Sequence, residues 1–161
     1  MIDYILKATL ILSFGIVFFQ DLKDRQVYWF LFPVIGGLCG FLFYKNTLFD
    51  LFLMSVLMNL FFITVLFIIV FLYATCKLKT SFFNTIGLGD LILFIGLSLS
   101  FSTISFIVIF ICALIFSLVI HLSMKKESIE ATVPLAGYMS LFFLITYISH
   151  WTGIIDSLYI I

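Results

Sequence analysis

One apolar run in this sequence is too long for a single membrane-crossing helix. Residues 82–121 form a run of 40 residues, and one helix of that length would measure about 60 Å. The hydrocarbon core of a bilayer is only about 30 Å thick. We therefore predict two crossings in this run, separated at its polar cluster, which consists of Ser98, Ser100, Ser102 and Thr103.

Four further runs are apolar enough to cross a bilayer, for which about 20 residues are typical and about 17 suffice. They are residues 4–20, 28–44, 51–74 and 134–150. The composition agrees, because 65% of the residues are hydrophobic and 10% are charged, whereas a soluble domain is about half apolar and about a quarter charged. The sequence thus predicts an all-α fold, a polytopic membrane bundle of about six transmembrane helices, with residues 1–161 as a single domain.

The basic residues predict how the helices are oriented. Six of them fall in the first, third and fifth connections between spans: Lys23, Arg25, Lys77, Lys79, Lys125 and Lys126. The opposite side has only Lys7 and Lys45. Because basic residues accumulate in cytoplasmic loops, we expect these three connections to face the cytoplasm. Residues 151–161 are expected at the membrane interface, with Trp151 and Tyr159 as aromatic anchors.

Charge and cysteine usage exclude several classes of function. Eight Lys and Arg residues balance eight Asp and Glu residues, so the chain has no net field that would attract nucleic acid, and we expect no such partner. The three cysteines, Cys39, Cys76 and Cys112, lie singly inside apolar runs, without metal-ligand spacing or a pairing pattern. We therefore expect no metal, no cofactor and no disulfide scaffold.

Two aspartates stand out, because a charge close to the hydrocarbon is costly. Asp21 ends the first span and Asp90 lies near the start of the fourth. Two complete spans separate them, so both lie on the same side of the membrane whichever way the chain is oriented. Gly87 and Gly89 precede Asp90, and such glycines let the backbone bend or a neighbour approach closely. We interpret this as an acid placed in a hydrated notch.

A pair of partly desolvated carboxylates has a specific chemistry. Because both cannot ionise cheaply, they share one proton, so one can act as a base on water while the other donates to a peptide carbonyl. This predicts aspartyl-protease catalysis by Asp21 and Asp90, with Gly87 and Gly89 as backbone support. Two non-catalytic explanations stay open. Asp21 and Arg25 are four residues apart and would pair on a continuing helix, and the helix dipole alone favours an aspartate at a helix start.

Other polar residues are expected to have lesser roles. Gln20, Arg25 and Asn84 lie close enough to the two acids in sequence to be candidates for hydrogen bonding around them. Asp24 is expected to be a solvated loop charge. Asn59, in the middle of the third span, is expected to hydrogen-bond between helices.

Three motifs resemble those of a known family. Asp21-Leu22-Lys23-Asp24-Arg25-Gln26-Val27 is similar to the first-aspartate motif of the type IV prepilin peptidase family, and Gly87-Leu88-Gly89-Asp90 is similar to its second, Gly-x-Gly-Asp, motif. Val133-Pro134-Leu135-Ala136-Gly137 resembles the start of the family's last helix. The order, the spacing and the six-span plan match over essentially the whole chain. The chain thus resembles a short form of the family, without the N-terminal segment associated with methyl transfer.

The resemblance implies a function and a partner. It implies that Asp21 and Asp90 are the catalytic pair of an intramembrane aspartyl endopeptidase in the inner (plasma) membrane. Such an enzyme cuts the short basic leader of prepilin-like precursors at the cytoplasmic face. Its partners would be a membrane-inserted precursor and the lipid bilayer.

The sequence departs from the family pattern at three positions. Tyr28 stands where the family usually has proline, Trp29 where a small polar residue is common, and Ile92 where lysine is often found. These departures keep a second interpretation open. In it the chain is a non-catalytic membrane protein, such as a carrier, an assembly subunit or a degenerate peptidase, that uses the aspartates for packing or proton binding.

Overall fold

The computed structural model describes residues 2–78, 87–124, 134–155 and 158–159. Within these residues all regular structure is helical and no strand occurs, which confirms the predicted all-α fold. The α-helices are α1 (Ile2–Lys23), α2 (Leu31–Asn46), α3 (Phe49–Tyr73), α5 (Leu88–Leu97), α6 (Thr103–Met124) and α7 (Leu135–Trp151), and a π-helical turn, η1 (Ala74–Leu78), continues α3. Each of the six predicted spans therefore contains one helix.

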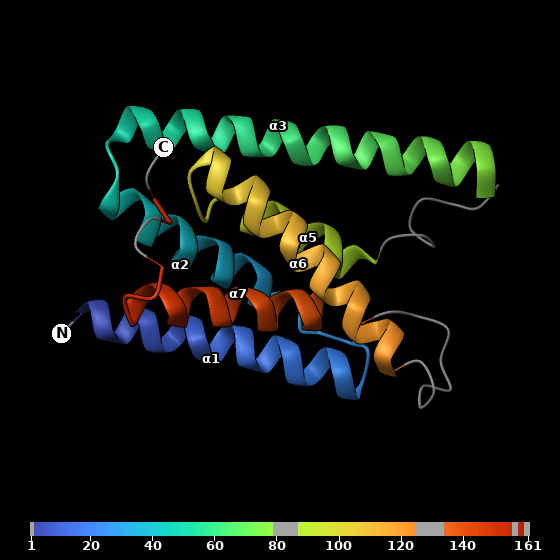
Figure 1. Cartoon of the computed structure of the whole chain (residues 1–161), viewed down its shortest axis with the longest axis horizontal. Coiled ribbons are helices and arrows are strands. Elements are labelled where there is room, and N and C mark those ends of the chain that lie inside the picture. Colours follow the sequence, from blue (N-terminus) through green and yellow to red (C-terminus); the bar gives the residue numbers. More distant parts are fainter. Residues whose placement is uncertain (1, 79–86, 125–133, 156–157, 160–161) are drawn as a thin grey trace.

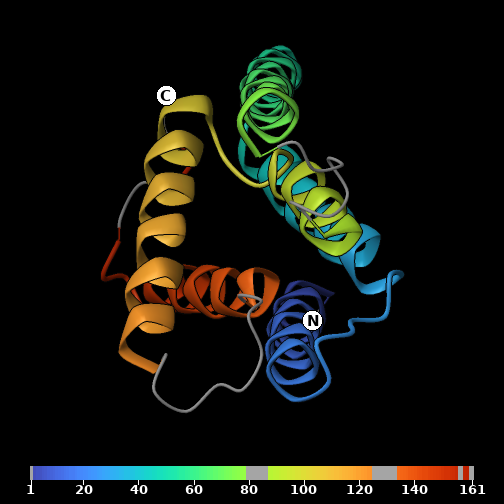
Figure 2. The ribbon, with the colours of Figure 1, turned by 90° about the vertical axis from the view of Figure 1, so that its right-hand side faces the viewer.

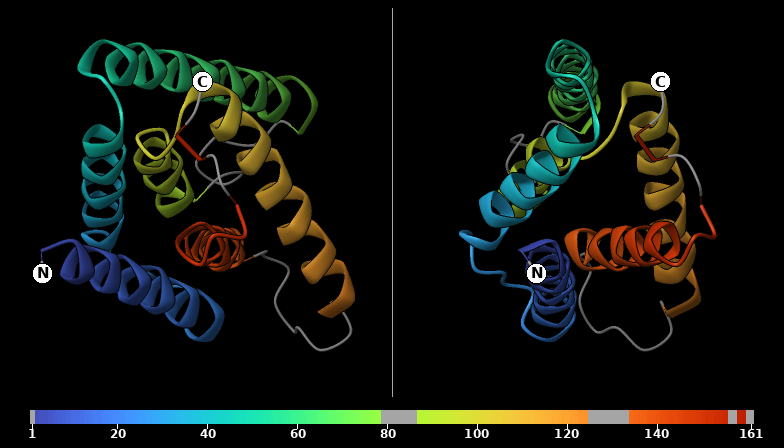
Figure 3. Two further views of the ribbon diagram at one scale, coloured as in Figure 1. Left: turned by 60° about the vertical axis from the view of Figure 1, so that its left-hand side comes forward. Right: turned by 90° about the vertical axis from the view of Figure 1, so that its left-hand side faces the viewer.

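Successive helices run in alternating directions, so their ends gather in two groups (Figure 1). We call the group at the right of Figure 1 the aspartate end, because α1 ends there with Asp21 in its last turn and α5 begins there with Asp90 in its first. α7 also begins at this end, whereas α1 begins and α2 ends at the opposite, far end. α1 packs beside α7 and α2 beside α5 (Figure 2), and α3 lies along the opposite edge of the bundle from α1 (Figure 3).

The helices differ in length more than the sequence predicted. Within the described residues, three segments are long and apolar enough to cross a membrane: Asp3–Lys23, Phe49–Lys77 and Thr103–Ser123. α2 and α7 have 16 and 17 residues, and α5 has only 10, which corresponds to about 15 Å. α5 is short because its helical backbone begins only after Gly87, which is extended, and ends at the predicted polar cluster. The chain is thus a membrane protein built from long and short helices.

Glycines let α2 and α5 approach closely. A Cβ atom added to Gly36 would lie 2.9 Å from the Cα atom of Gly96, and one added to Gly40 would lie 3.3 Å from the Cβ atom of Leu99. Gly36 and Gly40 are four residues apart and therefore share one face of α2, the spacing of small residues that is typical of close helix contacts in membranes. This contact fixes the position of α5, and with it that of Asp90.

The connection between α5 and α6 is a turn buried inside the bundle. Ser98, Ser100, Phe101 and Ser102 are all inaccessible to solvent. Non-helical backbone is tolerated in a membrane protein's interior only where the protein satisfies its polar groups. Asn59 of α3 satisfies two of these groups, because its Nδ2 atom donates to the backbone oxygens of Ser98 and Phe101, both at 2.9 Å. The predicted break and the predicted interhelical role of Asn59 are both confirmed.

The tail after α7 returns to the bundle at the far end. Leu158 is buried, and the ring of Tyr159 stacks on that of Phe43, with centroids 5.7 Å apart, and contacts that of Phe101. The ring of Tyr159 thus packs against the aromatic core of the bundle while remaining partly exposed at the far end, and its predicted role as an interfacial anchor stays a prediction. Trp151 is half-buried.

Candidate functional site

The carboxylate of Asp21 is buried against the start of α7. Asp21 lies in the last turn of α1 and is 9% exposed, which makes it the one charged residue that the fold buries in the described part of the chain. Its Oδ2 atom accepts a hydrogen bond of 2.6 Å from the backbone N–H of Gly137. This bond joins the first and the last helix of the bundle at the aspartate end.

α5 brings Asp90 to the same place. Asp90 is the third residue of α5 and is half-buried. Its carboxylate accepts hydrogen bonds from the backbone N–H groups of Ala136 and Gly87, and the negative charge of Asp21 acts on it. The bond to Gly87 resembles one half of a capping box, in which the acid at the third helical position reaches back to the N–H of the capping residue. The two aspartates thus both lie at the amino end of α7, near enough for their charges to interact.

The amino end of α7 supplies the donors that hold the pair. The first N–H groups of a helix have no acceptor within the helix, and Pro134, which precedes α7, has no N–H at all. Of the following groups, the N–H of Ala136 donates to Asp90 and that of Gly137 donates to Asp21. The dipole of α7 also places partial positive charge here, which offsets part of the repulsion between two carboxylates.

Two glycines leave room for the two carboxylates. A Cβ atom added to Gly137 would lie 3.0 Å from the Cβ atom and 3.1 Å from the Oδ2 atom of Asp21. One added to Gly87 would lie 3.3 Å from the Oδ2 atom of Asp90. At both positions a side chain would require the acid to shift by a few tenths of an ångström.

Gly89 and Gly137 show what the sequence did and did not reveal about this site. A Cβ atom added to Gly89 would lie 3.3 Å from the ring of Phe32, so Gly89 allows α5 to pack on α2 rather than contacting the acids. Gly137 was not among the predicted site residues. The sequence feature that could have indicated Gly137 is its position in the first turn of a helix that begins after Pro134. The N–H groups of such a turn can bind an anion.

The loop after α1 is fixed by α1 itself. The Oε1 atom of Gln20 accepts a hydrogen bond of 3.3 Å from the backbone N–H of Tyr28.

α1 ends before Arg25, which adopts a left-handed backbone with φ of 54°. The ion pair of Asp21 and Arg25 on a continuing helix is therefore excluded, although the positive charge of Arg25 still acts on Asp21 from the loop.

The same loop carries three consecutive exposed aromatic residues. Tyr28, Trp29 and Phe30 are 63%, 71% and 51% exposed, and the rings of Tyr28 and Phe30 stack with centroids 5.7 Å apart. Exposed aromatic side chains at helix ends are typical of the boundary between lipid and water. Asp24, in this loop, is exposed as expected.

The remaining predicted site residue, Asn84, lies outside the described residues. Among those that are described, no group of three or more His, Cys, Asp or Glu side chains is placed to hold a metal ion. The site therefore consists of two carboxylates from α1 and α5 and the backbone donors of α7 and Gly87. N–H donors favour the ionised form of a carboxylate, whereas the negative charge of Asp21 disfavours ionisation of Asp90.

No family model, curated protein or solved structure matches the chain.

Proposed function

We propose that this chain is an aspartyl endopeptidase of the membrane, with Asp21 and Asp90 as its catalytic pair. The observation that supports this best is that consecutive backbone N–H groups at the amino end of α7 bond both carboxylates, whose charges interact. Two ionised carboxylates close together repel each other, and this repulsion lowers the stability of the fold. Their presence is therefore easier to explain if they have a function. A shared proton between them is the use that their chemistry suggests.

The pair would hydrolyse a peptide bond in two steps. The ionised carboxylate takes a proton from a water molecule whose oxygen attacks the carbonyl carbon, while the protonated aspartate donates its proton to the carbonyl oxygen. The resulting diol then loses its C–N bond. The first aspartate gives the water's proton to the leaving nitrogen, and the second takes a proton back from the diol. The pair returns to its starting state with one proton.

The resemblance to prepilin peptidases suggests the substrate. It is a precursor whose short basic leader precedes an apolar helix, and cleavage takes place at the cytoplasmic face of the plasma membrane. Exposed apolar side chains surround the site, including Trp29 and Leu88, which are 71% and 62% exposed. They provide a surface on which the apolar helix of such a precursor would pack.

The experiment compares protein N-termini in membranes from cells that make the wild-type chain, Asp21→Asn, Asp90→Asn or Asp24→Asn. Asp24 is the matched control, because it lies three residues beyond Asp21 and is exposed. We expect a set of N-termini that lie just before apolar segments in the wild type and Asp24→Asn samples, and their loss in both other variants. The full-length precursors should accumulate there instead, and the lost N-termini identify the substrates.

Identical N-terminal profiles in all four samples, with equal amounts of each protein in the membrane, would contradict the protease assignment. The aspartates would then serve packing or proton binding, as in a carrier, an assembly subunit or a degenerate peptidase. Loss of cleavage in Asp24→Asn as well would mean that the loop charge, rather than the pair, controls the activity.

A further inference from the structure

A second polar site lies at the far end of the bundle, away from the two aspartates. It is a pocket of about 160 Å³ between the start of α1, the end of α2, and the end of α7 with its tail. Its polar and aromatic lining consists of Asp3, Lys7, Lys45, Asn46, His150, Trp151 and Tyr159. Neither the resemblance to peptidases nor the proposed hydrolysis gives these residues a role.

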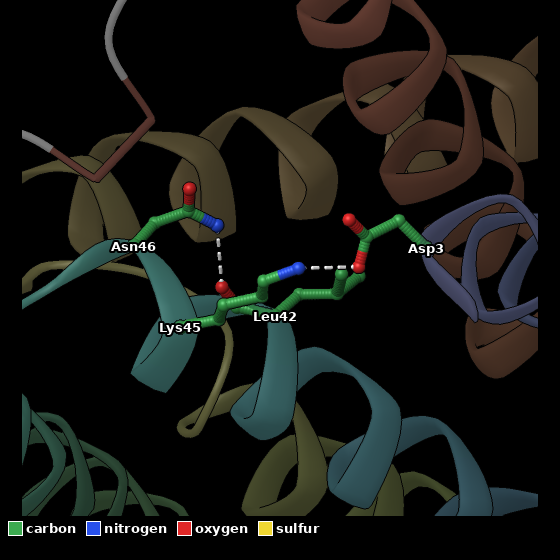
Figure 4. Close-up of polar contacts among 4 residues, drawn as sticks. All are labelled: Asp3, Leu42, Lys45 and Asn46. Atoms are coloured by element: carbon green, nitrogen blue, oxygen red, sulfur yellow. Dashed lines mark hydrogen bonds and ion pairs between the residues drawn. The ribbon is translucent and has the colours of Figure 1, made fainter. Parts of the chain in front are cut away.

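The charges in this pocket do not balance. Two lysines line it, and Asp3 is the only carboxylate among the described lining residues. Asp3 bonds to Lys45, with 2.6 Å between its Oδ1 atom and the lysine Nζ atom (Figure 4). Lys7 projects from the second turn of α1, and its Nζ atom lies 5.1 Å from the centre of the Trp151 ring. A ring face stabilises an ammonium group only in part, so one positive charge remains.

The other titratable side chains among the described lining residues do not supply the missing negative charge. The Nδ1 atom of His150 lies 2.9 Å from the carbonyl oxygen of Ile155, so this nitrogen donates its proton and the ring is neutral or positive. Burial raises the pKa of Tyr159, so its hydroxyl stays uncharged. Counted over the described residues that line it, the pocket therefore has a net positive charge beside apolar helices, where an unbalanced charge is costly.

We propose that this pocket binds a phosphate group, with Lys7 and Lys45 as its cationic ligands. The phosphate is that of an anionic lipid headgroup or a free phosphate ion. The surroundings favour the lipid, because exposed apolar side chains flank the pocket in sequence and would contact acyl chains. Tyr4 follows Asp3 and is 79% exposed, and Tyr44 precedes Lys45 and is 48% exposed. Trp151 is suited to the headgroup depth, because its ring is both apolar and able to donate a hydrogen bond.

The test measures lipid binding to the purified full-length protein in detergent by native mass spectrometry. The probes are phosphatidylglycerol, zwitterionic phosphatidylcholine, and inorganic phosphate added as a competitor. Lys7→Gln removes one ligand, and Lys23→Gln is its control, because it makes the same change near the other end of α1, where Lys23 is exposed. We expect phosphatidylglycerol to bind about tenfold more weakly to Lys7→Gln and normally to Lys23→Gln.

A third variant removes a negative charge from the pocket instead of a positive one. Asp3→Asn removes the carboxylate that competes with phosphate for Lys45, so we expect it to bind phosphatidylglycerol more tightly than the wild type. Circular dichroism checks that each variant keeps its helix content. If inorganic phosphate displaces the lipid in a Lys7-dependent manner, the pocket binds free phosphate. Three results would overturn the proposal. The first is equal binding of both lipids without competition by phosphate, and the second is an equal effect of Lys7→Gln and Lys23→Gln on lipid binding. The third is weaker binding of phosphatidylglycerol by Asp3→Asn. None of these measurements depends on proteolysis.

Discussion

The two ends of the bundle hold acidic side chains in different ways. At the far end, Asp3 bonds to the ammonium group of Lys45, and about half of each side chain is exposed. At the aspartate end, Asp21 is buried and bonds to the backbone N–H of Gly137, while Asp90 has backbone donors as well. Both Asp3 and Asp21 have a bond of 2.6 Å, so distance alone does not distinguish the two environments.

The difference shows why only one of these ends is suited to proton transfer. A carboxylate paired with an ammonium group stays ionised, because protonation would leave the positive charge without its partner. A carboxylate bonded to neutral N–H groups loses only those hydrogen bonds when it is protonated, although at Asp21 the positive charge of Arg25 also favours the ionised form. Asp21 and Asp90 also interact with each other, so protonation of one favours ionisation of the other. The pair at the aspartate end is thus suited to acid–base chemistry, and Asp3 to a fixed charge.

The largest effect is expected from Gly137→Ala, which alters the donor rather than the acids. The new Cβ atom would lie 3.0 Å from the Cβ atom of Asp21, so the carboxylate or α7 must shift by a few tenths of an ångström. A displacement of about 1 Å at a catalytic group costs roughly 10²-fold in rate, so on the proposed function we expect this smaller shift to reduce cleavage of the identified substrate by about fivefold to tenfold.

The matched control for this variant is Gly37→Ala in α2, where an added Cβ atom meets no heavy atom within 4 Å. It should cleave normally. Equal amounts of helical protein in both membranes would show that Gly137→Ala acts on the position of Asp21 rather than on folding. Normal cleavage by Gly137→Ala would mean that the bond from α7 does not position the acid.

The second prediction concerns the contact that places Asp90. In Gly36→Ala the new Cβ atom would lie 2.9 Å from the Cα atom of Gly96, and backbone atoms cannot turn aside as a side chain can. We expect the free energy of unfolding to fall by about 1 to 3 kcal/mol, although alanine favours a helix more than glycine does. Thermal unfolding in detergent measures this loss. An unfolding temperature equal to that of Gly37→Ala would show that α2 and α5 are not in contact at this point.

A smaller decrease in the free energy of unfolding is expected when the buried turn between α5 and α6 loses a hydrogen-bond donor. Asn59→Ala removes the donor to the backbone oxygens of Ser98 and Phe101. Polar contacts between membrane helices contribute about 0.6 to 1.7 kcal/mol each, so we expect a loss of about 1 to 2 kcal/mol in the same measurement. Thr64→Ala is the control, because the Thr64 hydroxyl is exposed and bonds within α3. Equal stability of the two variants would leave the turn without its proposed support.

The smallest effect is expected at the far end. Lys45→Gln removes the ion pair with Asp3, but both side chains are about half exposed, and exposed pairs contribute about 0 to 1 kcal/mol. We expect a decrease in the unfolding temperature that disappears at high salt. A large loss of stability that persists in high salt would contradict the view that the far end holds its acid by an exposed, weak ion pair.

The sequence predicted the helices and the meeting of the two aspartates for simple physical reasons. Apolar runs of sufficient length must cross the membrane, and their alternation places Asp21 and Asp90 on one side. The polar cluster in the long run marked the buried turn, and the position of Asn59 in the middle of a span indicated a bond between helices. Each of these inferences needs only spacing along the chain.

Other features depend on three-dimensional packing and could not be predicted in this way. The contact of Gly36 with Gly96 joins helices that are far apart in sequence, and only the assembled bundle shows which glycine meets which neighbour. The bond from Gly137 to Asp21 likewise joins helices that are far apart in sequence. The left-handed backbone of Arg25 was unexpected, because residues other than glycine seldom adopt it. The return of Tyr159 to the core depends on aromatic partners that the chain order does not reveal.

The most direct test measures the proximity of Asp21 and Asp90 in the membrane. The three native cysteines, Cys39, Cys76 and Cys112, are replaced by serine, and Asp21→Cys and Asp90→Cys are combined. A short bifunctional thiol reagent is then applied to intact membranes. In the control, Leu22→Cys replaces Asp21→Cys, because Leu22 is the next residue of α1 and is exposed. We expect mass spectrometry to show cross-linked peptides for the first pair and few for the control. Equal cross-linking of both pairs, or none, would contradict a site in which the two carboxylates act together.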